Sequence, residues 1–193
     1  MDHQLHTPAI KNAPCAETLP RQGLVTVFTG DGRGKTTAAI GTALRAAGHG
    51  LRVLIVFFMK GPDFIHGEAS ALGTIPNVTL RYFGSPGWVI PEGDNAAHRL
   101  KAQEGFAFAA DQVASGNYDL AVLDEAVSAV KFGLLPLEAV IQFIKAKPAG
   151  LELILTGRGA PAELTELADL VTEMKCIKHP FERGIAARAG VDY

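Results

Sequence analysis

A glycine-rich segment near the start of the chain has the residue types and spacing of a phosphate-binding loop. The segment is Thr29-Gly30-Asp31-Gly32-Arg33-Gly34-Lys35-Thr36-Thr37, and an apolar run at residues 24–28 leads into it. Its glycines allow a tight turn whose backbone N–H groups point at an anion, and the helix expected after it directs its positive end at the same point. Lys35 would reach the outer phosphates, and the Thr36 hydroxyl would hold Mg²⁺. These features predict a nucleotide-binding site.

The loop is shorter than the standard pattern, in which four residues separate the first glycine from the Gly-Lys pair. Thr29 stands where that first glycine is expected, and Gly30 leaves only three residues before Gly34. A strand-to-helix turn with incidental glycines is the alternative interpretation. Phosphate binding is favoured because strand, turn, Lys-Thr pair and helix coincide as the motif requires.

The acidic pair Asp124-Glu125 is the second candidate group, because it directly follows the apolar run at residues 119–123. In phosphate-loop proteins such a pair lies beside the loop and completes the Mg²⁺ environment, directly or through water. The alternative is that the dipole of a following helix favours acidic residues at its amino end. We predict that Thr36, Asp124 and Glu125 form the metal site, and that Lys35, Thr36 and Glu125 take part in catalysis.

Two further candidates lie in loops that are expected to follow strands. Arg158, in the segment Thr156-Gly157-Arg158, would clamp a phosphate with two hydrogen bonds, although a surface arginine beside a turn explains it nearly as well. Trp88 is the only tryptophan and lies in a loop rich in glycine and proline. It would either contact a flat ligand or cover the core.

The elements that must position these residues alternate along the chain. Apolar runs of strand character occupy residues 24–29, 52–59, 78–83, 119–123, 152–156 and 170–177, and helical stretches occupy residues 36–47, 94–115, 136–146 and 161–168. This alternation predicts an α/β fold of three layers with a mostly parallel six-stranded sheet, of the phosphate-loop NTPase (RecA-like) class. Ligands of such sheets bind beyond the carboxyl ends of the strands. The phosphate loop, Lys60-Gly61, Trp88, Asp124-Glu125 and Arg158 should therefore meet at one edge.

Length and composition limit the class of protein. The chain has 193 residues, of which 48% are hydrophobic and 20% charged, which is typical of a compact soluble protein. We expect residues 23–193 to form a single nucleotide-binding α/β domain, and the polar, proline-bearing residues 1–22 to form a flexible N-terminal arm or lid. The net charge of −2 does not favour a nucleic-acid partner. With no apolar run of membrane-spanning length and no signal peptide, we expect a cytoplasmic protein without a membrane partner.

Beyond these motifs, the sequence from about residue 23 to residue 193 resembles the ATP:corrinoid adenosyltransferases of the bacterial cobalamin pathway. The resemblance includes the shortened phosphate loop and the run Val122-Leu123-Asp124-Glu125. Its most specific part lies toward the C-terminus and comprises residues 155–161, 167–174, 177–181 and Gly190-Val191-Asp192-Tyr193. A generic ATPase has no reason to have this C-terminal pattern.

The resemblance implies a reaction in which the protein needs no nucleophile of its own, and none stands out in the sequence. A reduced corrinoid, as Co(I), attacks the 5′ carbon of the ATP ribose, and inorganic triphosphate leaves. The protein's task is then to hold the ribose in line and to stabilise the departing triphosphate. The resemblance implies ATP and a corrinoid as substrates, Mg²⁺ as cofactor, a flavoprotein-type reductant and a homodimer. It also implies that ATP lies reversed relative to ordinary phosphate-loop hydrolases.

The chain departs from the family pattern at three places. A proline-bearing arm replaces the amphipathic N-terminal helix that often covers the corrinoid. Pro86 stands where members have a Phe, which together with the loop Trp displaces the lower cobalt ligand. Val127-Ser128 replaces an Asn or Thr followed by Tyr. These departures concern the handling of the corrinoid more than the binding of ATP.

Two other functions remain open at this point. A RecA-like ATPase or nucleotide-dependent switch would use Glu125 to orient water, although such a protein normally has a loop of standard length. A corrinoid- or nucleotide-binding module without catalysis is the other alternative. The phosphate product distinguishes them, because transfer releases triphosphate, hydrolysis releases ADP and phosphate, and a binding module releases neither.

Overall fold

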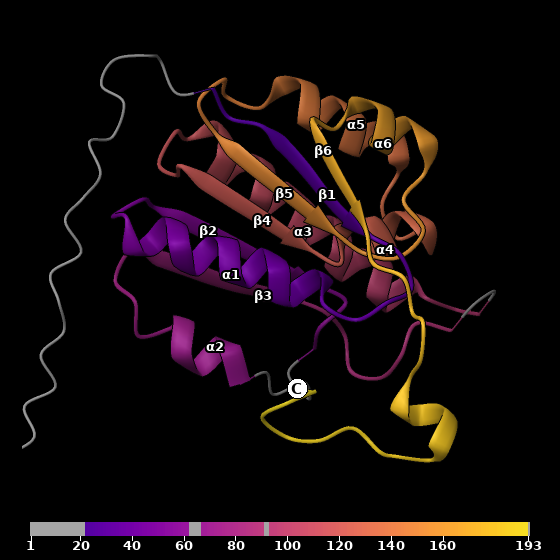
Figure 1. Cartoon of the computed structure of the whole chain (residues 1–193). Coiled ribbons are helices and arrows are strands. Elements are labelled where there is room, and N and C mark those ends of the chain that lie inside the picture. Colours follow the sequence, from indigo (N-terminus) through magenta and orange to yellow (C-terminus); the bar gives the residue numbers. More distant parts are fainter. Residues whose placement is uncertain (1–21, 62–66, 91–92, 193) are drawn as a thin grey trace, which may run out of the picture.

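A single parallel sheet forms the centre of the computed structural model, which describes residues 22–61, 67–90 and 93–192 (Figure 1). Its six strands are β1 (Val25–Thr29), β2 (Val53–Phe58), β3 (Val78–Phe83), β4 (Leu120–Asp124), β5 (Glu152–Thr156) and β6 (Leu170–Glu173). Their order across the sheet is β3-β2-β4-β5-β1-β6, and every neighbouring pair is parallel. The predicted α/β fold is confirmed, and the carboxyl ends of all these strands share one edge.

Helices cover both faces of the sheet, as the three-layer prediction requires. They are α1 (Lys35–Gly48), α2 (Gly67–Leu72), α3 (Ala96–Ala114), α4 (Ala126–Lys131), α5 (Leu137–Ala146) and α6 (Ala162–Leu167), and the 3₁₀ turn η1 (Pro180–Arg183) follows the last strand. Apolar side chains of α1 and α2 pack on one face, and those of α3 to α6 pack on the other. Figure 1 shows α1 crossing in front of the sheet. Within the described part of the chain, none of the helices combines the length and hydropathy that a bilayer crossing needs.

Strand β2 shows why the sequence favours this arrangement. All six of its side chains are buried, and they alternate between the two faces. Val53, Ile55 and Phe57 contact the α1 layer, whereas Leu54, Val56 and Phe58 contact the opposite layer. A strand covered on both faces has no place for polar side chains, so its sequence is a continuous apolar run.

The structure corrects the predicted elements at a few places. Sequence periodicity missed the short helices α2 and α4, whose six residues each are too few to show a helical repeat clearly. The last strand ends at Glu173 and not at residue 177, and its side chains are exposed because β6 lies at the edge of the sheet. The predicted arm at residues 1–22 lies outside the described residues except for its last position, so the domain division stays a prediction.

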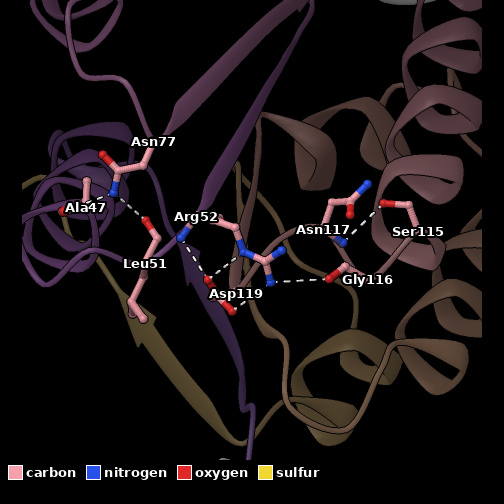
Figure 2. Close-up of polar contacts among 8 residues, drawn as sticks. All are labelled: Ala47, Leu51, Arg52, Asn77, Ser115, Gly116, Asn117 and Asp119. Atoms are coloured by element: carbon pink, nitrogen blue, oxygen red, sulfur yellow. Dashed lines mark hydrogen bonds and ion pairs between the residues drawn. The ribbon is translucent and has the colours of Figure 1, made fainter.

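Polar contacts fix the strands at the amino edge of the sheet, opposite the predicted site (Figure 2). The Asp119 carboxylate accepts hydrogen bonds from the Arg52 backbone N–H at 2.8 Å and from its guanidinium at 3.2 Å. The Asn77 amide donates to the carbonyls of Ala47 and Leu51 at 3.0 and 2.7 Å. These bonds hold the starts of β2, β3 and β4 in register, so their carboxyl ends are aligned as well.

The core around β4 should dominate stability. Leu123 has no exposed surface, so Leu123→Ala would leave a cavity between the sheet and the α3–α6 layer and should lower the free energy of unfolding by about 2–5 kcal/mol. Leu100→Ala is the matched control, because Leu100 is 57% exposed on α3 and its loss should change stability by less than about 0.5 kcal/mol. Urea unfolding followed by circular dichroism measures both, and equal effects would contradict the prediction.

Candidate active site

The phosphate loop, residues 30–34, turns sharply between β1 and α1. Gly30 and Gly34 have φ angles of 93° and 117°, which L side chains rarely adopt. A Cβ atom at Gly30 would also lie 2.4 Å from the carbonyl oxygen of Met174. Within the described residues, no side chain caps the amino end of α1 after Gly34, and an uncapped helix amino end is a ready anion site.

Lys35 lies over this loop as the motif predicts. Its ammonium donates to the carbonyl oxygens of Gly30 and Gly32, both at 2.7 Å, and the residue is 6% exposed. Burial lowers the pKa of Lys35 most, and the nearby Arg158 lowers it further. Three carboxylates act in the opposite direction and raise the pKa of Lys35, namely Glu125, Asp31 and Asp124. Side chains from the loop, β4 and the β5 turn therefore share one electrostatic environment.

Asp124 ends β4 with a carboxylate that has no exposed surface. One of its oxygens accepts a hydrogen bond from the Thr156 hydroxyl at 2.7 Å, and the other lies 2.6 Å from the ammonium of Lys60. The Thr156 hydroxyl in turn accepts from the backbone N–H of Glu125 at 2.9 Å. Because β5 lies between β1 and β4, Thr156 occupies the space between the acidic pair and the phosphate loop.

Glu125 adopts a backbone conformation that is unusual for its residue type. Its φ is 63°, and among the described residues only Met59 shares a positive φ without being glycine. A left-handed non-glycine residue costs on the order of 1–3 kcal/mol, and such residues cluster at functional sites. Met59 and Glu125 each follow directly after a strand that ends at the same edge, so both strained positions border the site.

Arg158 sits on a turn that its neighbours hold firmly. Its backbone N–H donates to the Ser128 hydroxyl at 2.9 Å, while the residue is exposed. Gly157 has a φ of 146°, and a Cβ there would lie 2.3 Å from the Ser128 nitrogen. Val127 and Ser128 are both buried. The pair Val127-Ser128, one of the departures from the family pattern, thus supports the turn that carries Arg158.

Arg33 contacts the C-terminal segment of the chain. Its guanidinium lies 2.5 Å from the Asp192 carboxylate and also donates to the Val191 carbonyl. Arg188 binds the same carboxylate through Nε at 2.9 Å. Hydrogen bonds from Arg188, with a smaller contribution from Arg33, hold the pKa of Asp192 below its ordinary value. Sequence analysis placed Arg33 in the phosphate loop but did not predict that this loop is tied to the C-terminal segment.

Trp88 lies in the loop after β3 and is 77% exposed, which argues against its alternative role as a cover for the core. The start of this loop packs on the segment that follows β2, since a Cβ at Gly84 would lie 2.4 Å from the backbone of Lys60. Pro86 is exposed in the same loop. The loop is thus anchored beside Lys60 and presents an indole to solvent, where a flat ligand could contact it.

A cleft of about 370 Å³ opens on the side of the phosphate loop that is opposite to Trp88. Its walls come from the end of β1, the loop, α4, the β5–α6 connection, α6 and β6, through Thr29, Gly30, Asp31, Lys131, Gly159, Ala160, Thr165, Val171 and Glu173. Strand β3, which leads to Trp88, and strand β6, beside this cleft, are the two edges of the sheet. The candidate site therefore extends across the full carboxyl edge, with the phosphate loop between Trp88 and the cleft.

The structure brings together most of the residues that the sequence singled out. Lys35, Asp124, Glu125 and Arg158 interact electrostatically, whereas Thr36 and Thr37 occupy the first turn of α1 and Trp88 lies toward the β3 edge. Sequence analysis placed Lys60 at this edge but gave it no role, and it gave no role to Thr156. The available signal was their position, two residues after β2 for Lys60 and at the end of β5 for Thr156, because every strand end at this edge borders the site.

Comparison with known proteins identifies the family that the sequence motifs resemble. The family model described as ATP:corrinoid adenosyltransferase BtuR/CobO/CobP matches residues 21–193. The corrinoid adenosyltransferase CobA of Salmonella typhimurium is 40% identical over 94% of this chain and 91% of its own length. Corrinoid adenosyltransferases of Escherichia coli K12 and Pseudomonas aeruginosa are 36% and 35% identical over 94% and 96% of this chain, each with 91% of its own length covered.

A comparison of folds extends the likeness to a distant protein. A KaiC-like protein from the archaeon Pyrococcus horikoshii superposes with a TM-score of 0.56 at 16% identity, over 81% of this chain and 75% of that one. Identity this low shows the fold alone. The family match covers the phosphate loop, the acidic pair and the C-terminal segment together. The chain belongs to the ATP:corrinoid adenosyltransferase family.

Proposed function

We propose that this protein transfers the 5′-deoxyadenosyl group of ATP to the Co(I) centre of a reduced corrinoid, with release of triphosphate, in the biosynthesis or salvage of adenosylcobalamin. The observation that carries the proposal is the meeting of Lys35, Arg158 and the Asp124-Glu125 pair at one sheet edge, in a chain of this family. Cobalt is the nucleophile in this reaction, so the protein has to supply position and charge only.

The phosphate loop suits the binding of the triphosphate that leaves. Lys35 is held over the loop, the uncapped amino end of α1 offers backbone N–H groups, and Arg158 lies close enough to lower the pKa of Lys35. Two cations and a helix amino end would bind the triphosphate more strongly as negative charge develops on it during bond breaking. This is the stabilisation that a charged leaving group needs.

Mg²⁺ fits this site as a cofactor that neutralises phosphate charge. The Thr36 hydroxyl and the Glu125 carboxylate are hard oxygen donors, which Mg²⁺ prefers, and Glu125 is near enough to raise the pKa of Lys35. Among the described residues no group of three or more His, Cys, Asp or Glu could hold a metal. Mg²⁺ bound together with a nucleotide takes most of its ligands from phosphate oxygens and water. The buried carboxylate of Asp124, next to Glu125 in the chain, adds negative charge to the metal's surroundings.

The corrinoid would dock on the side of the loop that leads to Trp88, whose exposed indole offers a flat apolar contact. The proposal further includes a flavoprotein-type reductant that supplies Co(I), a homodimeric assembly and a cytoplasmic location. These three points are supported by family resemblance.

The test is an anaerobic incubation of the protein with Mg-ATP and chemically reduced cobalamin or cobinamide. A light-sensitive adenosylated corrinoid together with inorganic triphosphate is the expected result. ADP and phosphate without a change in the corrinoid spectrum would refute transfer and indicate an ATPase in which Glu125 orients water. Bound nucleotide without any product would indicate a binding protein.

Replacing Lys35 should remove most of the activity. Lys35→Ala deletes a buried cation of the phosphate loop, so the rate of adenosyl transfer should fall at least about 100-fold. Lys145→Ala is the matched control, because Lys145 is an exposed lysine in the last turn of α5 and should retain the full rate. Triphosphate release measured under saturating ATP reports both, and a Lys35→Ala protein of normal rate would contradict this role.

Trp88 should matter more for one corrinoid than for another. If its indole helps to displace the lower cobalt ligand, Trp88→Ala should slow transfer to cobalamin by roughly tenfold or more. Cobinamide has no lower nucleotide ligand, so its rate should fall less. Steady-state rates with each corrinoid measure the ratio, and ATP binding should remain unchanged. Equal losses of rate with cobalamin and cobinamide would contradict a role of Trp88 in displacing the lower ligand and would indicate a contact common to both corrinoids.

A further inference from the structure

Lys60 forms a largely buried ion pair with Asp124. Its ammonium lies 2.6 Å from one Asp124 oxygen and 4.8 Å from the centre of the Phe57 ring. Its side chain is 13% exposed, and that of Asp124 is 0% exposed. Phe57 lies near the end of β2, and Lys60 is two residues beyond that end. Because β2 is next to β4, which ends with Asp124, the pair is fixed by the ends of two neighbouring strands.

The other Asp124 oxygen is also occupied. It accepts the Thr156 hydroxyl at 2.7 Å, and that hydroxyl accepts the backbone N–H of Glu125 at 2.9 Å. Both oxygens of Asp124 therefore have protein partners, and neither reaches solvent. The neighbouring Glu125 is only half-buried, so it is the carboxylate of the pair that a hydrated ion can reach.

A divalent ion bound directly to Asp124 would conflict with this arrangement. Mg²⁺ binds carboxylate oxygens at about 2.0–2.1 Å, and the Lys60 ammonium already occupies a hydrogen-bond position on one of these oxygens. The two cations would lie within a few ångströms of each other in a buried environment, where charge repulsion is weakly screened. Direct coordination would require Lys60 to leave both Asp124 and the Phe57 ring.

We propose that the Lys60 ammonium neutralises the charge of Asp124 and so prevents a divalent metal from binding to this carboxylate. The metal then enters only together with nucleotide phosphates, and Thr36 and Glu125 hold it. The inference deepens the proposed function, since it assumes that the same site takes a metal-bound nucleotide. Asp124 is then a positioning residue, which through Thr156 holds the strained backbone of Glu125. Lys60 determines which of the two carboxylates the metal meets.

Mn²⁺ binding without nucleotide tests the inference, because electron paramagnetic resonance distinguishes free from bound Mn²⁺. The wild-type protein should bind Mn²⁺ weakly without nucleotide and much more tightly with ATP. Lys60→Met keeps the apolar stem and removes the charge, so it should bind Mn²⁺ without nucleotide at least roughly tenfold more tightly than wild type. Lys60→Arg keeps a cation at Asp124 and should bind Mn²⁺ as weakly as wild type.

Two controls assign a gain in binding to Asp124. The double variant Lys60→Met/Asp124→Asn lacks the released carboxylate and should lose the gain, whereas Lys101→Met removes an exposed lysine of α3 and should behave as wild type. A folded Lys60→Met protein with wild-type Mn²⁺ affinity would overturn the inference. If Lys60→Met does not fold, the wild-type titration decides, because tight Mn²⁺ binding without ATP would also overturn it. The assay contains no corrinoid, so a failure of adenosyl transfer leaves its outcome interpretable.

Discussion

Asp124 ends the central strand β4 with a carboxylate that is fully enclosed, so its charge has to be balanced inside the protein. Lys60 after β2 supplies the cation, and Thr156 at the end of β5 supplies a hydroxyl. These partners come from the two strands that flank β4. Removing one member of a buried ion pair typically costs about 3–5 kcal/mol, although such pairs add little net stability. The structural effect of the Lys60–Asp124 ion pair, together with the Thr156 hydrogen bond, is therefore to fix positions, because these contacts hold three strand ends and the strained Glu125 at one place.

The phosphate loop obeys a second constraint, which is its close packing on the end of β6. The Gly32 N–H donates to the Met174 carbonyl at 2.6 Å, and a Cβ at Gly32 would lie 2.7 Å from that oxygen. One N–H group of the shortened loop is thus directed at the protein and not at a ligand. On the outer side, Arg33 is bound to Asp192. A loop held on both sides presents its remaining N–H groups in a fixed direction, which suits a site that must stabilise charge without rearranging.

The sequence predicted the fold well wherever burial on both faces leaves a continuous apolar run, as in β2 and β4, and wherever glycine is required, as at Gly30 and Gly34. It failed where the deciding contact joins distant segments. Sequence analysis placed Lys60 at the same sheet edge as Asp124, but it did not predict that Lys60 and Thr156 both bind this carboxylate. Those contacts depend on the order of strands in the sheet, which no local sequence pattern shows. For the same reason Arg33 was predicted to serve the nucleotide alone, and its contact with Asp192 was missed. The boundary of β6 was wrong because an exposed edge strand lacks the apolar pattern that marks the others.

The departures from the family pattern differ in their structural consequences. Val127-Ser128 is buried beneath the Gly157-Arg158 turn, and its serine hydroxyl accepts the Arg158 N–H. That substitution therefore acts on the position of Arg158, which is proposed to bind phosphate. Pro86, in contrast, is exposed two positions before Trp88. Proline has no backbone N–H and fixes φ near −65°, so Pro86 stiffens the loop where the family has an aromatic ring. Under the proposed docking of the corrinoid at Trp88, Pro86 is the described departure that would change this contact, because it would exchange a second stacking surface for a more rigid support of the indole.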